Sequence, residues 1–107
     1  MLTEGKYILD ENGNPKPEPD LMVWAEWFEK SQEKRRVALT KIGDKEVSTV
    51  FLGMDHSFGR GSLLLYETMV FGDEDGIQER YSTKEEALAG HDKIVKQYDS
   101  NSKPKDE

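Results

Sequence analysis

The chain contains no cysteine, and this absence removes several classes of function at once. Disulfide bonds, thiolate metal sites and cysteine nucleophiles all require that side chain. Histidine is scarce as well, with two residues in the chain, so a metal centre built on imidazole ligands would have to be completed by carboxylates. We therefore expect no metal and no cofactor, and a reducing compartment is allowed.

Long hydrophobic runs are also missing. No segment approaches the ~20 consecutive apolar residues that a membrane-spanning helix needs. The first ten residues, Met1 to Asp10, have neither the basic start nor the apolar centre of a signal peptide. The sequence thus predicts no membrane association and a cytoplasmic location.

Positive charge is in short supply. The 107 residues include 15 basic and 22 acidic side chains, which gives a formal net charge of −7. Such a balance disfavours general attraction to nucleic acid phosphates. It suits a soluble protein, and it would also suit an inhibitor that presents carboxylates to a basic groove on a partner. The hydrophobic fraction is 35%, but the apolar residues are clustered and periodic, so we expect a single compact domain.

The first third of the chain is predicted to form a short strand, a loop and a helix. Residues 6–9 are typical of a strand, and the loop 10–19 follows, with an Asn-Gly pair and three alternating prolines. Asp20 occupies an N-cap position before a segment whose apolar residues recur at helical spacing. We expect a helix from about Leu21 to Ser31.

The middle of the chain is rich in β-formers interrupted by turns. Short connections at 43–45 and 72–76 favour hairpins, while the intervening loop 55–62 is longer and rich in glycine. The pattern predicts an antiparallel meander of four strands, at residues 36–42, 46–54, 63–71 and 77–81.

Apolar residues occur on both faces of the second and third of these strands. Val47 and Phe51 share one face of the second strand, while Val50 and Leu52 share the other. Strands of this kind are usually covered on both sides, by helices or by a second copy of the chain. The pattern is therefore compatible with a homodimer.

The last helix has two overlapping capping boxes, in which Ser82 precedes Glu85 and Thr83 precedes Glu86 by three positions. It should begin near Lys84 and lie along the sheet through a stripe that includes His91. We predict an α+β domain over residues 1–98, in which an N-terminal and a C-terminal helix pack on the four-stranded antiparallel meander. The polar tail, residues 99–107, is predicted to be disordered.

Asp55, His56 and Arg60 make the long loop the clearest place to look for a site. Asp55 and His56 would supply at most two adjacent metal ligands, and Ser57 lacks the flanking glycines of a nucleophile elbow. A turn in which Asp55 accepts hydrogen bonds from nearby amides is the favoured interpretation. A small enzyme that uses these residues is kept as an alternative, and no catalytic residue is assigned.

His91 lies on the apolar stripe of the last helix. It either makes a hydrogen bond to the sheet or to the loop that contains Asp55, or it faces a site. We favour a structural role.

Candidate partner-binding residues lie elsewhere. Trp27 is placed to the side of Trp24 and Phe28 on the first helix, and exposed aromatic residues dominate many interfaces. The cluster Asp73, Glu74 and Asp75 stands at a hairpin tip, where it could contact a basic protein partner.

Three segments together resemble a known family: residues 47–59 (VSTVFLGMDHSFG), 66–72 (YETMVFG) and 79–91 (ERYSTKEEALAGH). The chain is similar to a family of small, functionally uncharacterised proteins encoded by tailed phages and prophages. The resemblance also takes in residues 7–10 and the Trp-rich helix, and it brings no activity, ligand or catalytic residue with it. It implies a viral origin, expression in the cytoplasm of a bacterial host and an accessory role that works by binding.

Three functional hypotheses follow from the sequence. The first is a phage-encoded accessory protein, not an enzyme, that binds a host or phage macromolecule, for example to inhibit a host defence. The second is a structural homo-oligomer or minor virion component, and the third is the small enzyme based on the loop.

Overall fold

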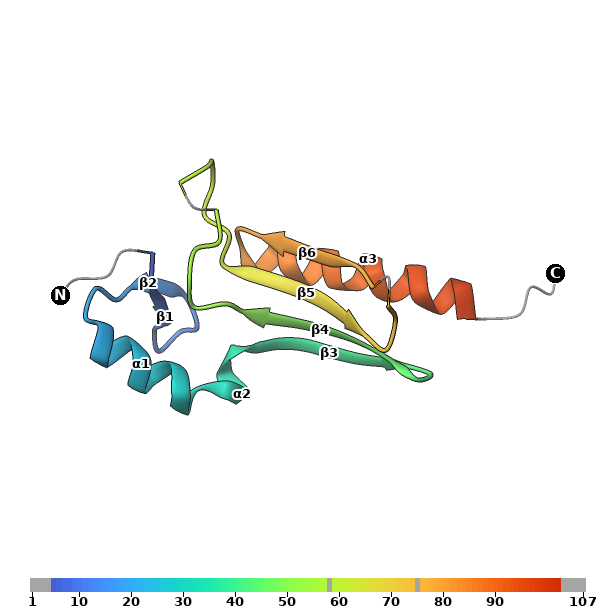
Figure 1. The fold of residues 1–107 in the computed structure, drawn as a ribbon, viewed down its shortest axis with the longest axis horizontal. Coiled ribbons are helices and arrows are strands. Elements are labelled where there is room, and N and C mark those ends of the chain that lie inside the picture. Colours follow the sequence, from blue (N-terminus) through green and yellow to red (C-terminus); the bar gives the residue numbers. More distant parts are fainter. Residues whose placement is uncertain (1–4, 58, 75, 103–107) are drawn as a thin grey trace.

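The computed structural model describes residues 5–57, 59–74 and 76–102 of the chain, and shows an α+β fold (Figure 1). The helices are α1 (Leu21–Lys30), α2 (Gln32–Arg35) and α3 (Lys84–Ser102). The strands are β1 (Tyr7–Leu9), β2 (Pro15–Pro17), β3 (Arg36–Ile42), β4 (Lys45–Phe51), β5 (Tyr66–Phe71) and β6 (Gln78–Tyr81).

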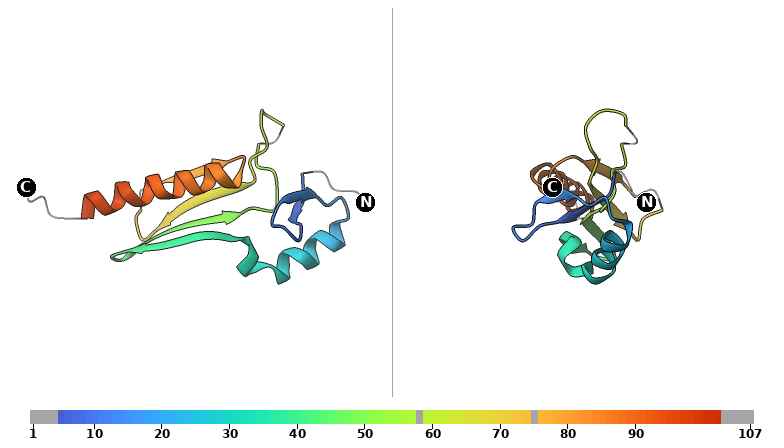
Figure 2. Two further views of the ribbon diagram at one scale, coloured as in Figure 1. Left: turned by 180° about the vertical axis from the view of Figure 1, so that it is seen from behind. Right: turned by 90° about the vertical axis from the view of Figure 1, so that its left-hand side faces the viewer.

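The predicted meander is present. The larger sheet has the order β3-β4-β5-β6, and all of its neighbouring strands are antiparallel. α3 crosses one face of this sheet and contacts all four strands, as the view from behind shows (Figure 2). The opposite face, turned toward the viewer in Figure 1, is not covered by any described helix.

The core lies between α3 and the covered face, and it follows from the alternation of side chains along β4 and β5. Val47, Thr49 and Phe51 on β4 are completely buried. Two apolar clusters result: Phe51, Leu65, Tyr66 and Ala87 form one, and Val47, Val70 and Ile94 form the other.

The predicted placement of the N-terminal helix is confirmed only in part, because α1 lies at one end of the sheet and reaches its core through one residue. α1 contacts the β1–β2 ribbon beyond the end of β4 (Figure 1). The indole N–H of Trp24 donates to the carbonyl oxygens of Tyr7 and Gly53, at 3.2 and 3.0 Å. Trp27 makes the contact with the main core, edge to face with Phe51 at 6.0 Å between ring centroids. The N-terminal unit is therefore joined to one end of the sheet.

Several predicted boundaries also differ from the structure. The second strand of the meander ends at Phe51 and not at residue 54. The proline-rich loop contains β2, because Pro15 and Pro17 flank Lys16 in a two-stranded ribbon that does not need their missing N–H groups. Residues 63–65 are not part of β5, and Leu64 and the carbonyl of Leu65 bond to the loop after β4. α3 continues past Tyr98 to Ser102, so the predicted start of the tail at residue 99 is wrong; residues 103–107 lie outside the described residues.

Candidate functional site

The carboxylate of Asp55 closes the long loop between β4 and β5. Its Oδ1 accepts hydrogen bonds from the backbone N–H groups of Ser57 and Leu64, both at 2.9 Å, and its Oδ2 accepts one from the Ser57 hydroxyl at 2.8 Å. The Leu64 amide is the main cause of a lowered pKa of Asp55, and the Ser57 bonds act in the same direction against the effect of burial. Asp55 thus has the turn-forming contacts that the sequence favours.

His56 lies close enough to Asp55 for its charge to help lower the pKa of that carboxyl. The Nδ1 atom of His56 lies 3.0 Å from the Met54 carbonyl oxygen. Arg60 is exposed, and its backbone N–H donates to the Ser57 carbonyl. Asp55, His56 and Arg60 are near one another in the sequence. Both carboxylate oxygens of Asp55, however, accept hydrogen bonds from within the loop.

His91 is buried between α3 and the sheet, away from this loop. Its Nε2 lies 2.9 Å from the Thr40 hydroxyl on β3, and its Nδ1 lies 2.7 Å from the Thr49 hydroxyl on β4. Thr49 is in turn bonded to the hydroxyl of Thr68 on β5. One imidazole therefore connects the helix to three adjacent strands.

The surroundings of His91 favour its neutral form. Burial lowers the pKa of the imidazole below its ordinary value of 6.5, and the nearby carboxylate of Asp92 opposes this shift only in part. Both ring nitrogens are engaged by hydroxyl groups, so neither is available to a ligand. The geometry is that of a structural histidine, and of the two hydrogen bonds that the sequence left open, to the sheet or to the Asp55 loop, the structure shows the one to the sheet.

The candidate partner-binding residues are not all exposed. Trp27 is half-buried against Phe51. Asp73 accepts a hydrogen bond from the Tyr98 hydroxyl at 2.9 Å, which ties the β5–β6 connection to α3. Glu74 is exposed, and Asp75 lies outside the described residues.

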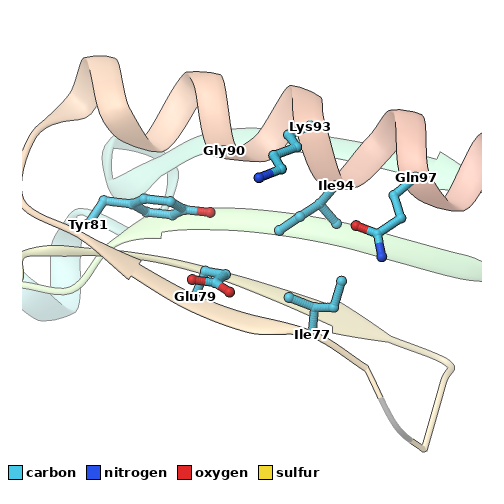
Figure 3. A pocket seen from close by; sticks show the side chains of 7 residues that line it. All are labelled: Ile77, Glu79, Tyr81, Gly90, Lys93, Ile94 and Gln97. Atoms are coloured by element: carbon cyan, nitrogen blue, oxygen red, sulfur yellow. The ribbon is translucent and has the colours of Figure 1, made fainter.

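Sequence reasoning missed a groove of about 430 Å³ between β6 and the second half of α3 (Figure 3). Tyr81, Glu79 and Ile77 approach it from the strand side. The helix contributes Gly90, Lys93, Ile94 and Gln97. A glycine inside an amphipathic helix was the available signal, because it costs about 1 kcal/mol relative to alanine and then usually has a packing reason.

The packing reason for Gly90 is its contact with Tyr81. A Cβ atom at Gly90 would overlap the end of the Tyr81 ring, so the ring lies directly against the helix backbone. The Tyr81 hydroxyl is buried and has no hydrogen-bond partner among the described residues. A buried hydroxyl of this kind costs about 1–3 kcal/mol when it is unpaired. It is the one buried side-chain oxygen or nitrogen without a hydrogen-bond partner among the described residues.

The uncovered face of the sheet is a second surface with unusual chemistry. Leu39 and Phe71 expose 39% and 49% of their area there. On the same face, the nearly buried Glu67 of β5 accepts hydrogen bonds from two side chains of β6. The donors are Gln78 Nε2 at 2.6 Å and Arg80 Nε at 3.0 Å. The face is therefore mixed, with apolar residues beside a paired charge.

Among the described residues, no three side chains of His, Asp or Glu come together as metal ligands. None of the described helices is both long enough and apolar enough to span a bilayer. Comparison of the chain with protein-family models, curated proteins and solved structures finds no significant match.

Proposed function

We propose that this protein acts by binding another protein, as a phage-encoded accessory factor in the cytoplasm of a bacterial host, for example to block a host defence. The observation that carries the proposal is the open groove between β6 and α3, which combines apolar side chains with the charges of Glu79 and Lys93. A bound partner would cover these side chains.

The hydrogen bonds of the titratable side chains also favour a binding function over catalysis. Asp55 and His91 use their oxygens and nitrogens in hydrogen bonds that hold the loop and the helix in place. These contacts stabilise the fold, and the Ser57 hydroxyl, which donates to the Asp55 carboxylate, is itself buried. Binding therefore fits the described residues better than catalysis.

Affinity capture from lysate of the host bacterium tests the proposal. Two variants on the exposed side of α3 change the net charge equally: Lys93→Glu alters the groove, and Lys96→Glu lies outside its lining. We expect wild type and Lys96→Glu to recover the same specific protein, and Lys93→Glu to recover several-fold less. Recovery of no specific macromolecule under several conditions would contradict a binding function.

A homo-oligomeric structural role is the second candidate, because the uncovered sheet face exposes Leu39 and Phe71. In that case light scattering would find a dimer or larger assembly, and Phe71→Glu would dissociate it. Leu88→Glu is a matched control, since Leu88 is 41% exposed on α3. A strict monomer that is absent from purified virions would exclude this role.

A further inference from the structure

The first turn of α1 exposes three consecutive apolar residues. None of the residues of α1 is buried, and Leu21, Met22 and Val23 keep 45%, 76% and 46% of their area exposed. The helix lies on the outside of the molecule, beyond the end of the larger sheet (Figures 1 and 2). A contiguous apolar patch of this kind is typical of an interaction site.

The patch continues into a hollow of about 270 Å³ on the surface of α1 and α2. The lining of the hollow follows a single helical stripe, at Val23, Glu26, Trp27, Lys30, Ser31 and Lys34. Trp27 contributes an aromatic ring, which its edge-to-face contact with Phe51 fixes to the core. The hollow therefore contains a rigid aromatic group, the kind of side chain that contributes most to binding at many interfaces.

Arg35 fixes α2 against the end of α1. Its guanidinium donates to the carbonyl oxygen of Phe28 at 3.1 Å and to the Ser31 hydroxyl at 3.2 Å, and it lies over the Phe28 ring. These contacts hold Lys34, the preceding residue, at the opposite end of the stripe from Val23. The hollow is thus formed before a partner binds, which lowers the entropic cost of binding.

The charge at the Lys34 end is opposite to that of the whole chain. Residues 30–36 carry four basic side chains and one acidic side chain, in a protein with a formal net charge of −7. Lys30 forms an exposed ion pair with Glu26, whereas Lys34 makes no ion pair among the described residues. This end of the hollow is therefore complementary to an acidic side chain.

We propose that α1 and α2 bind an amphipathic helix of a partner protein, with its apolar stripe over Val23 and Trp27 and an acidic residue against Lys34. This surface is separate from the groove between β6 and α3, and the inference does not depend on that groove. The backbone of α1 is hydrogen-bonded within the helix, so a partner gains side-chain contacts here and no strand pairing. A helix presents neighbouring side chains at i, i+3 and i+4 while its own backbone groups stay paired.

The order of the lining residues defines the pattern that the partner helix should carry. Val23 and Trp27 are four positions apart, so two apolar residues three or four positions apart would cover them. Lys34 lies seven positions after Trp27, so an aspartate or glutamate one to two turns from the apolar pair would reach it. The ten residues of α1 extend about 15 Å, which a partner helix of about three turns matches.

A display library of helical peptides of about four turns, randomised on one face and selected against the intact protein, tests the inference. We expect the enriched peptides to share the apolar pair and the acidic residue. Lys34→Glu should weaken their binding about fivefold, because it turns an attraction into a repulsion. Lys96→Glu, on the exposed side of α3, makes the same change in net charge and should leave binding unchanged.

Exchange of the two charges separates a direct contact from a general effect of net charge. A peptide in which lysine replaces the acidic residue should bind Lys34→Glu more tightly than it binds wild type. Val23→Glu should weaken binding about tenfold without lowering the stability of the free protein, because an acidic residue is favourable in the first turn of a helix. Proline in the middle of the peptide should abolish binding, because it breaks the helix.

The inference is overturned if no peptide is enriched, if Lys34→Glu and Lys96→Glu bind equally, or if exchange of the charges does not restore binding. Tolerance of the central proline would identify an extended ligand and reject the helix. Capture of a cellular partner that depends on Lys93 and not on Lys34 would preserve the binding function proposed above and reject this second surface.

Discussion

The Nδ1 atom of His91 lies 2.7 Å from the hydroxyl oxygen of Thr49, so a buried hydrogen bond joins the C-terminal helix to the centre of the sheet. The Nε2 atom makes the corresponding contact with Thr40. Polar groups in this position are costly to leave unpaired, and the network orients α3 across the strands.

Replacement of His91 by alanine should destabilise the protein by about 3 kcal/mol, because it leaves a cavity and unpaired threonine hydroxyls. Urea denaturation monitored by circular dichroism would measure the loss. His56→Ala in the long loop serves as the control and should change stability by less than about 1 kcal/mol. Equal effects of the two substitutions would contradict the network.

Stability should fall as the pH drops below about 6.5, because the pKa of buried His91 is lowered in the folded state. Below the ordinary pKa the unfolded chain binds a proton that the folded protein does not, and the loss ends once the pH has passed the folded pKa. The groups that face the ring from β3 and β4 are uncharged threonines, and Asp92 is adjacent on α3.

Denaturation near pH 7.5 and 5.5 would measure this effect against His91→Gln, which cannot take up the proton. Wild type should lose more stability than the variant over this range. A variant with the same pH dependence would assign the effect to other groups.

Gly90→Ala should destabilise the protein by about 1–3 kcal/mol despite the better helix propensity of alanine, because its Cβ atom would overlap the Tyr81 ring. Tyr81→Leu should remove most of this penalty. A double-mutant cycle measured by thermal unfolding would show the coupling, and additive effects would argue against a direct contact.

Asp55→Ala should loosen the loop, since the amides of Ser57 and Leu64 lose their acceptor. We expect faster hydrogen exchange at those two amides and a loss of about 2 kcal/mol. The lowered pKa of Asp55 means that its contribution is present above the ordinary value of 3.8 and is lost as the pH falls through the folded pKa. Preservation of both the fold and the biological effect in an Asp55→Ala, His56→Ala variant would exclude the enzyme hypothesis.

The meander could be predicted because its signals are local. Alternating β-formers and short glycine turns determined the four strands, and the capping boxes before Lys84 located α3. Glu86 indeed bonds back to the amides of Ser82 and Thr83, while Thr83 caps Glu86. The residues that interact in a turn or a capping box lie within a few positions of one another in the sequence.

The position of α1 could not be predicted, since it depends on contacts between distant residues. Helical spacing placed Trp24 and Phe28 on one face, but it could not show that Trp24 would bond to Gly53 or that Trp27 would reach Phe51. The groove was missed for the same reason. Gly90 and Tyr81 are nine positions apart and meet only after α3 has packed on the sheet.

Gly53 joins the N-terminal unit to the end of β4. Its carbonyl oxygen accepts hydrogen bonds from the Tyr7 amide and the Trp24 indole, and a Cβ atom there would lie 2.9 Å from the Phe28 ring. The first thirty residues are synthesised before this acceptor. The hydrogen bonds of Tyr7 and Trp24 to Gly53 therefore require that β3 and β4, which lie between them in the chain, have already been synthesised.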